Sequence, residues 1–202
     1  MASFFRRVTI VISLLLVTLV GVPARTHVDT ASAAPAVSVT VNPSSVLGTR
    51  PSGWYGLSIE YSALVGATIA VTPVLVNLMR NLGPSVLRIG GNTVESQPGS
   101  GPNVAQLGAL KNLLTQTGWR VLYSIDLIHF NAVAEAAEVR NVITALGSRV
   151  AAFACGTEPD GYVQKTWRPP TYTVSQYLAE AATCYQVVRT NAPGVPLDGP
   201  DT

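Results

Sequence analysis

The chain alternates between short apolar runs and longer segments in which apolar residues recur with the period of a helix. The apolar runs lie at 54–62, 85–91, 120–127 and 150–156, and Leu197–Asp201 resembles the end of a fifth strand. Helical periodicity covers about 73–82, 104–117, 131–146 and 174–190, and glycine closes several of these segments. Short strands that alternate with helices predict βα units around a parallel sheet.

The N-terminal segment has the three-part layout of a secretory signal peptide. Arg6 and Arg7 precede an uncharged apolar run at 8–22, and Ala31-Ser32-Ala33 follows. The run has 15 residues, whereas about 20 are needed to span a bilayer. We therefore expect residues 1–33 to be cleaved, and we expect a secreted or extracytoplasmic protein without a stable membrane anchor.

Residues 34–53 are expected to form a linker that contains one strand. The segment Val37–Val41 alternates apolar and polar side chains, which is typical of a half-buried strand, and Asn42-Pro43 closes it. We assign this strand to an accessory β layer. Residues 54–202 are then expected to form one α/β domain with a substantial core.

The charge of the chain argues against a nucleic-acid partner. Removal of residues 1–33 leaves ten basic and ten acidic side chains, and no basic cluster follows Arg25. Proteins that bind nucleic acid need a basic stripe. Two histidines and two cysteines provide almost no material for a metal site. We therefore expect no nucleic acid, no metal and no organic cofactor.

The clearest candidate for chemistry is Glu158, in the segment Gly156-Thr157-Glu158-Pro159-Asp160 that follows the apolar run at 150–156. The catalytic groups of α/β barrels lie where strands end and loops begin. Pro159 cannot donate to a sheet ladder and would end the strand at the carboxylate. Glu158 is therefore a candidate general acid/base. The alternative is an ordinary surface turn, for which Glu-Pro-Asp-Gly is suitable.

Other polar side chains follow the earlier strands and are expected at the same edge of the sheet. Glu60 ends the first apolar run, Asn92 and Glu95 follow the second, and Asp126 and His129 follow the third. Asp126 could position a hydroxyl group of a ligand. Asn92 could instead belong to a simple turn, and His129 could be a packed loop residue.

Four further charged residues have weaker assignments. Arg88, inside the second apolar run, could orient a carboxylate through its planar donors or could be purely structural. Glu135, Glu138 and Glu180 fall within helical segments, where we expect them on solvated faces.

The two cysteines have two possible states. If Gly156 and Glu158 face a barrel axis, strand alternation turns Cys155 outward toward the helices, and Cys184 lies on the next helix. A disulfide between them is one possibility, which an exported protein would allow. Two buried thiols are the other.

Several motifs resemble, in order and spacing, the N-terminal half of glycoside hydrolase family 79. That family includes β-glucuronidases and heparanase-like enzymes. The motifs are GLSIEYS from Gly56, LRIGGNTVE from Leu87, LYSIDL at 122–127 and ACGTEPDGY at 154–162. The resemblance covers about 37–202. It implies a partial (β/α)8 barrel of four to five βα units, with an attached β-sandwich to which Val37–Val41 would contribute.

The resemblance also implies an activity, the retaining hydrolysis of β-glycosides that contain uronic acid. Glu158 matches the family's acid/base, and Glu60, Glu95, Asn92 and Thr157 match positions that bind the sugar or support the site. Thr157 stands where the family usually has an asparagine that contacts the sugar 2-hydroxyl. The family's nucleophile lies on strand seven, for which this sequence has no counterpart.

A closed (β/α)8 barrel needs about 200 residues at the least and about 250 typically. Residues 34–202 number 169, so we expect either an open α/β domain in its own right or the N-terminal half of a larger barrel, and the family resemblance implies the half-barrel. The competing interpretation is a non-catalytic remnant or a carbohydrate-binding half-barrel. Its open sheet edge would need a covering segment or a complementary barrel half as partner.

Overall fold

A computed structural model describes residues 53–96 and 101–199, together with the single positions 40, 42, 44, 45, 48 and 49. The expected signal peptide at 1–33 lies outside these residues, as does the expected strand at 37–41 apart from Thr40. The chain divides into two compact units, Met1–Val46 and Leu47–Thr202, and every element below belongs to the second.

The second unit is built on one sheet of five parallel strands in sequence order. The strands are β1 (Gly56–Glu60), β2 (Val86–Gly90), β3 (Arg120–Ile125), β4 (Val150–Cys155) and β5 (Leu197–Asp198). Parallel neighbours require a crossover between them, and each crossover here contains at least one helix. The predicted α/β class and the predicted parallel sheet are therefore confirmed.

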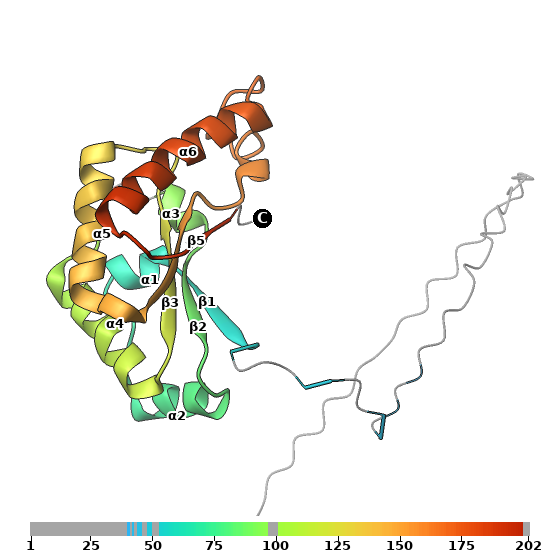
Figure 1. Ribbon diagram of the computed structural model, residues 1–202, viewed down its shortest axis with the longest axis vertical. Coiled ribbons are helices and arrows are strands. Elements are labelled where there is room, and N and C mark those ends of the chain that lie inside the picture. The colour runs from blue at the N-terminus through green and yellow to red at the C-terminus, as the bar shows by residue number, and fades with distance from the viewer. Residues whose placement is uncertain are drawn as a thin grey trace, which may run out of the picture. The chain divides into compact units, whose positions relative to one another are not determined.

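Helices cover one face of this sheet, with α4 and α5 running alongside the strands (Figure 1). The helices are α1 (Tyr61–Val65), α2 (Pro73–Asn81), α3 (Asn92–Ser96), α4 (Val104–Thr117), α5 (Ala132–Leu146) and α6 (Val174–Asn191). Short 3-10 turns lie at Gly147–Arg149 and Pro159–Gly161. The sequence pattern predicted the four longer helices to within a few residues but not α1 and α3, which have five residues each. None of the described helices is long and apolar enough to cross a membrane.

The ends of the longer helices carry local signals that explain where they begin and stop. Asn103 and Thr173 form capping boxes with the glutamines three residues later, so backbone N–H groups of the first turn are satisfied. Thr72 accepts a hydrogen bond at the start of α2. Gly118 ends α4 in the left-handed conformation.

Alternation along the strands divides the sheet into two faces with different side chains. The face toward the helices is apolar and buried, and it includes Leu87, Ile89, Tyr123, Ile125, Phe153 and Cys155. The other face mixes polar or small side chains, among them Ser58, Arg88, Ser124 and Ala154, with the apolar Val86 and Leu122. This is the face that would point into a barrel.

Cys155 lies on the helix-facing side of β4, and in the structure it forms a disulfide with Cys184 of α6. Their Cα atoms are 6.2 Å apart, within the usual range for a disulfide. The bond ties the end of β4, three residues before Glu158, to the helix that packs behind it.

The expectation of solvated faces is wrong for Glu135 and Glu138 of α5, which are only 6% and 8% exposed. The turn of α5 that carries them faces the interior, where tyrosine hydroxyls supply hydrogen bonds. Tyr123 donates to Glu138 at 2.6 Å and Tyr61 at 3.2 Å. Glu180 of α6 is half-buried and bonded to other side chains. Burial of these carboxylates depends on partners from distant elements, which helical periodicity does not reveal.

Candidate active site

The carboxyl ends of β1 to β4 meet at one edge of the sheet, and the predicted site residues gather there. Glu60 is the last residue of β1, and Asn92 lies two residues after β2. Asp126 directly follows β3, and Glu158 lies three residues after β4. The parallel register pairs Glu60 with Gly90 and Ile125 with Cys155, so these strand ends are level with one another.

Glu158 has a backbone conformation that is rare for a residue with a side chain. Its φ of 50° and ψ of 57° lie in the left-handed region, which costs about 1–2 kcal/mol for a non-glycine residue. Pro159 begins a 3-10 turn directly after it, and the N–H of Gly161 bonds to the carbonyl oxygen of Glu158 at 2.9 Å. Strained residues of this kind concentrate at functional sites. The turn lifts Glu158 out of the sheet, and its side chain is 49% exposed.

Lys165 is the nearest charged partner of Glu158, and the sequence analysis did not identify it. Its Nζ lies 2.6 Å from Oε2 of Glu158 and 2.6 Å from Oδ1 of Asn92. The ammonium also lies 5.0 Å from the ring centroid of Trp167, within the range of a cation–π contact. Lys165 thus joins the loop after β2 to the loop after β4. Its position seven residues after Glu158, just past a compact turn, was the available signal.

Glu60 is held by the start of α3. Its Oε2 accepts hydrogen bonds from Oγ1 of Thr93 at 2.7 Å and from the N–H of Thr93 at 3.1 Å. Gly91 makes this approach possible, because a Cβ atom there would lie 2.3–2.5 Å from the Glu60 carboxylate. A side chain at position 91 and this orientation of Glu60 therefore exclude each other.

Arg88 lies between these carboxylates on the inner face of the sheet. Its Nη1 donates to Oγ of Ser58 at 3.0 Å, and its Nη2 lies 3.5 Å from Oγ1 of Thr157. Burial lowers the pKa of Arg88, while the negative charges of Glu60 and Glu158 act in the opposite direction. Arg88 therefore supplies a positive charge to this edge, and its role in orienting a carboxylate stays a prediction.

Thr157, directly before Glu158, is only 1% exposed. Its hydroxyl faces Arg88, and its backbone N–H is also bonded to a side chain, that of Glu95 at 3.0 Å. Thr157 thus lies beneath the exposed part of the site. A direct contact between Thr157 and a sugar stays a prediction.

Asp126 organises the loop after β3. Its Oδ1 accepts from the backbone N–H groups of Ile128 at 2.8 Å and His129 at 3.0 Å. Its Oδ2 lies 3.0 Å from Nδ1 of His129. The Asp126 side chain is 15% exposed, and the hydrogen bonds given above are all made within its own loop. Contact between Asp126 and a ligand also stays a prediction.

Glu95 of α3 is completely buried and connects the loops after β3 and β4. Its Oε2 accepts from the N–H groups of Leu127 at 3.0 Å and Ile128 at 2.9 Å. Its Oε1 accepts from the N–H of Thr157 at 3.0 Å and from the hydroxyl of Tyr162 at 2.6 Å. Burial, together with a neighbouring carboxylate, raises the pKa of Glu95 to about 8. The structure thus places Glu95 in support of the site, which is one of the roles considered for it from the sequence.

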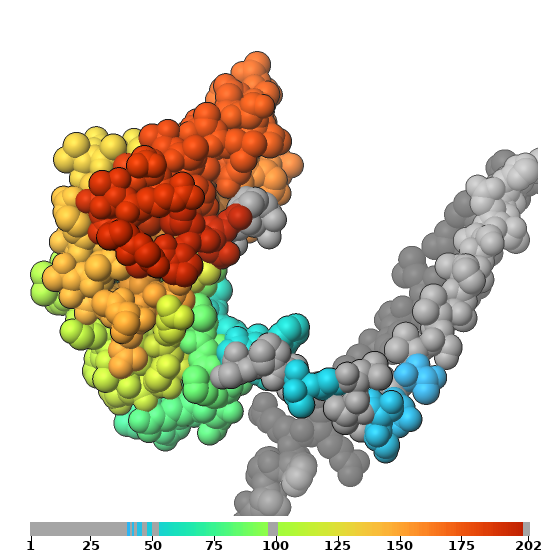
Figure 2. Space-filling view, viewed as in Figure 1, coloured from blue at the N-terminus to red at the C-terminus, as the bar shows by residue number. Residues whose placement is uncertain are grey.

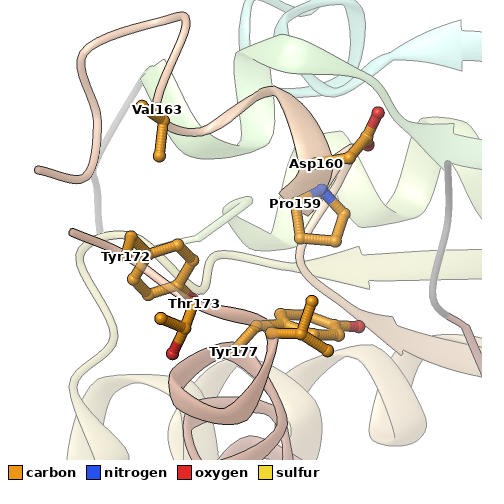
Figure 3. A pocket seen from close by; sticks show the side chains of 7 residues that line it. Pro159, Asp160, Val163, Tyr172, Thr173 and Tyr177 are labelled. Atoms are coloured by element: carbon orange, nitrogen blue, oxygen red, sulfur yellow. The ribbon is translucent and has the colours of Figure 1, made fainter. Parts of the chain in front are cut away.

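A cavity of about 320 Å³ lies beside the turn that follows Glu158. Figure 3 shows the rings of Tyr172 and Tyr177 on one side of it, with Pro159 and Val163 opposite. Asp160, Thr173 and Val174 complete the lining. Small-molecule pockets begin at about 300 Å³ and are mostly apolar and aromatic, so the cavity suits a single ring. The segment that forms it packs against α6 (Figure 2).

Within 53–96 and 101–199, no group of three or more histidine, cysteine, aspartate or glutamate side chains is arranged to hold a metal ion. The functional groups that gather at this edge are carboxylates, an amide, an ammonium and a guanidinium.

Comparison with solved structures identifies the architecture. The chain is similar to a 4-O-α-L-rhamnosyl-β-D-glucuronidase from Fusarium oxysporum, solved as a Rha-GlcA complex, with a TM-score of 0.50 and 21% sequence identity. The match covers 71% of this chain and 37% of that one. The fold is that of part of an α/β barrel. This chain thus spans less than half the length of the glucuronidase.

A second similar structure is the virulence factor SghA from Agrobacterium tumefaciens, with a TM-score of 0.40 and 17% identity over 61% of this chain and 34% of SghA. No family model matches the sequence, and no curated protein matches it.

Proposed function

We propose that this chain forms the acid/base side of the active site of a retaining glycoside hydrolase similar to the β-glucuronidases of family 79. Glu158 is the general acid/base. The observation that carries the proposal is the placement of Glu158 on a strained turn at the carboxyl end of β4, exposed and beside Asn92 and Lys165. That edge is where barrel enzymes place their catalytic groups.

In this mechanism Glu158 protonates the oxygen of the leaving group as the glycosidic bond breaks. A second carboxylate, about 5–5.5 Å away, attacks the anomeric carbon and forms a glycosyl-enzyme intermediate. Glu158 then removes a proton from the water molecule that hydrolyses this intermediate. By family resemblance the nucleophile belongs to strand seven, beyond the five strands described here.

The other carboxylates at this edge suit supporting roles. Glu60, Glu95 and Asp126 each accept hydrogen bonds that hold a neighbouring loop. Asn92 and Glu60 are exposed or half-buried at the surface of the site, where they suit contacts with sugar hydroxyls. The positive charges of Arg88 and Lys165 suit a substrate that contains uronic acid.

We further propose that the protein acts outside the cytoplasm, as its N-terminal sequence predicts. The bond between Cys155 and Cys184 supports this location, because disulfides persist in oxidising compartments.

A carbohydrate-binding role without hydrolysis is the second candidate. It is favoured by the hydrogen bonds that already occupy the carboxylates of Glu60, Glu95 and Asp126. Arg88, Asn92 and the aromatic cavity would suffice to bind a sugar.

Hydrolysis of aryl β-glucuronides tests the proposal, assayed with this chain together with a complementary barrel half that supplies strand seven, and with aryl β-glucosides and β-xylosides as comparators. Glu158→Gln is expected to slow a substrate with a poor leaving group, such as 4-methylumbelliferone, by about 100-fold or more. A dinitrophenyl glycoside, which needs little protonation, should lose much less. Lys111→Met is the control, since Lys111 is exposed on α4 and is not among the residues of this edge. Binding without turnover by the folded chain would favour the second candidate.

A further inference from the structure

Lys165 shares its ammonium group between the candidate acid/base and a predicted sugar-binding residue. The distances from Nζ to Glu158 and to Asn92 are both 2.6 Å. An ammonium has three N–H donors, and the described residues accept two of them. The lysine therefore keeps one donor for a ligand while it holds both loops together.

The surrounding backbone is shaped to bring this lysine back toward Glu158. The N–H of Gly161 bonds to the carbonyl of Glu158, and the N–H of Lys165 bonds to the carbonyl of Gly161, both at 2.9 Å. A Cβ atom at position 161 would lie 3.2 Å from Cε of Lys165, so the absence of a side chain at Gly161 leaves room for the lysine side chain. The ring of Trp167 packs against the ammonium of Lys165. The Lys165 side chain is 27% exposed, so it is mostly enclosed but still reaches solvent.

This contact has a direct consequence for proton transfer. Lys165 covers one oxygen of the Glu158 carboxylate, since its Nζ lies 2.6 Å from Oε2. A general acid needs a proton there and free access to the leaving oxygen. The ammonium must therefore be drawn away before Oε2 can donate a proton to the leaving oxygen. Lysine can do this, because its charge is carried on a flexible four-carbon stem.

A carboxylate on the ligand is the group best suited to draw Lys165 away. A neutral hydroxyl in the same place would leave the partly enclosed ammonium without a negative partner, which is unfavourable. Arg88 is a poorer candidate, because its Nη1 already bonds to Ser58 and its Nη2 faces Thr157.

We propose that Lys165 is an exchangeable clamp that binds the carboxylate of a uronic-acid glycoside and, in doing so, releases Glu158. The inference rests on the proposed role of Glu158 as general acid. On release, Glu158 takes a proton from solvent and passes it to the leaving oxygen as the bond between the anomeric carbon and that oxygen breaks. Lys165 is thus a specificity-determining and positioning residue, and it does not itself transfer a proton.

The lysine content of the chain allows a direct test, because Lys111 and Lys165 are its only lysines. Protein labelled with carbon-13 at lysine Cε gives two side-chain signals by NMR, and Lys165→Met identifies them by removing one. Phenyl β-D-glucuronide and phenyl β-D-glucoside form a matched pair that differs at the sugar carboxylate. The glucuronide is expected to shift the Lys165 signal and the glucoside to leave it in place. Lys111, exposed on α4, serves as an internal reference.

Affinities for the same two ligands give the second readout. The wild-type chain is expected to prefer the glucuronide by about tenfold, the size of one added charged hydrogen bond. Lys165→Met should remove this preference, Lys165→Arg should restore part of it, and Lys111→Met should leave it unchanged. Glu158→Gln should increase it, because the lysine then has no competing carboxylate. A merely structural ion pair would not produce that increase.

Three outcomes would overturn the inference: equal weakening of both ligands by Lys165→Met, an unmoved Lys165 signal with bound glucuronide, or no glucuronide binding by the folded chain. None of these readouts needs turnover. Absence of hydrolysis therefore counts against the proposed function alone, while hydrolysis without charge preference counts against the clamp alone.

Discussion

The hydroxyl of Tyr162 donates a 2.6 Å hydrogen bond to the buried carboxylate of Glu95, across 67 residues of sequence. Tyr162 is itself fully buried, four residues after Glu158. The same Glu95 oxygen accepts the N–H of Thr157, the residue before Glu158. The loop that carries the candidate acid/base is therefore anchored on both sides of Glu158 by one carboxylate of α3.

Replacement of Glu95 by glutamine tests this anchor. An amide NH2 group would take the place of one carboxylate oxygen and face N–H or O–H donors, so at least two donors would lose their acceptor. Each buried donor left unsatisfied costs about 1–3 kcal/mol. We expect Glu95→Gln to lower the free energy of unfolding in urea by that order and to weaken binding of sugars.

Glu180→Gln is the matched control for this substitution. Glu180 accepts bonds from Arg168 at 3.0 Å and Tyr172 at 2.9 Å, but its side chain is 35% exposed and water can replace the lost acceptor. The control should therefore lose less stability than Glu95→Gln. Equal losses in the two variants would argue against a special role for the buried Glu95 network.

The disulfide between Cys155 and Cys184 gives a second prediction. It closes a loop with a sequence separation of 29 residues, for which chain entropy predicts a stabilisation of about 2–4 kcal/mol. Replacement of both cysteines by alanine should lower the unfolding midpoint accordingly. Reduction should destabilise the wild type and leave the double variant unaffected, whereas a wild type insensitive to reductant would contradict the prediction.

Buried Glu135 predicts an unusual dependence of stability on pH. Burial, with the negative charges of Glu138, Asp126 and Glu95, raises the pKa of Glu135 to about 8, and its Oε2 has no hydrogen-bond partner among the described residues. Because the folded state holds the proton more tightly than the unfolded state, this contribution is fully present below about pH 4.5 and is lost as the pH rises toward 8.

Glu135→Gln isolates this effect, since glutamine cannot ionise. The variant and the wild type should have similar unfolding free energies in urea at pH 5. At pH 8 the variant should be more stable, by on the order of 2 kcal/mol. Asp160→Asn, at an exposed carboxylate, should show no such divergence. A wild type that gains stability between pH 5 and pH 8 relative to Glu135→Gln would refute this account.

The sequence predicted the parts of this site that follow from local pattern and topology. The carboxyl ends of the strands in a parallel sheet share one edge. The sequence alone therefore predicted that Glu60, Asn92, Asp126 and Glu158 lie at that edge. Lys165 could not be placed in this way. Its bond to Asn92 spans 73 residues, and nothing in the local pattern around either residue encodes that distance.

The same reason explains the error at Glu135 and Glu138. Helical periodicity indicates which positions share a face. It does not show that tyrosine hydroxyls from α1 and β3 donate hydrogen bonds to a carboxylate on that face. The sequence did not predict the short helices α1 and α3, because five residues are too few to show helical periodicity. Tertiary partners, rather than local preference, decide these features.

Gly91 allows a final prediction that separates the shape of the site from its stability. Gly91 has a φ of +79°, and Gly118 has a φ of +76°. Alanine at either position incurs the cost of a left-handed backbone, about 1–2 kcal/mol. A new Cβ at 118 meets nothing within 4 Å, whereas one at 91 meets the Glu60 carboxylate.

Because the Glu60 carboxylate ends a flexible side chain, it can turn away from alanine at position 91 at little further cost. The two variants should therefore have similar unfolding free energies. Gly91→Ala alone should break the bonds from Thr93 to Glu60 and weaken sugar binding or turnover, which titration with phenyl β-D-glucuronide would measure. Unchanged affinity in Gly91→Ala would mean that the position of Glu60 is irrelevant to the ligand.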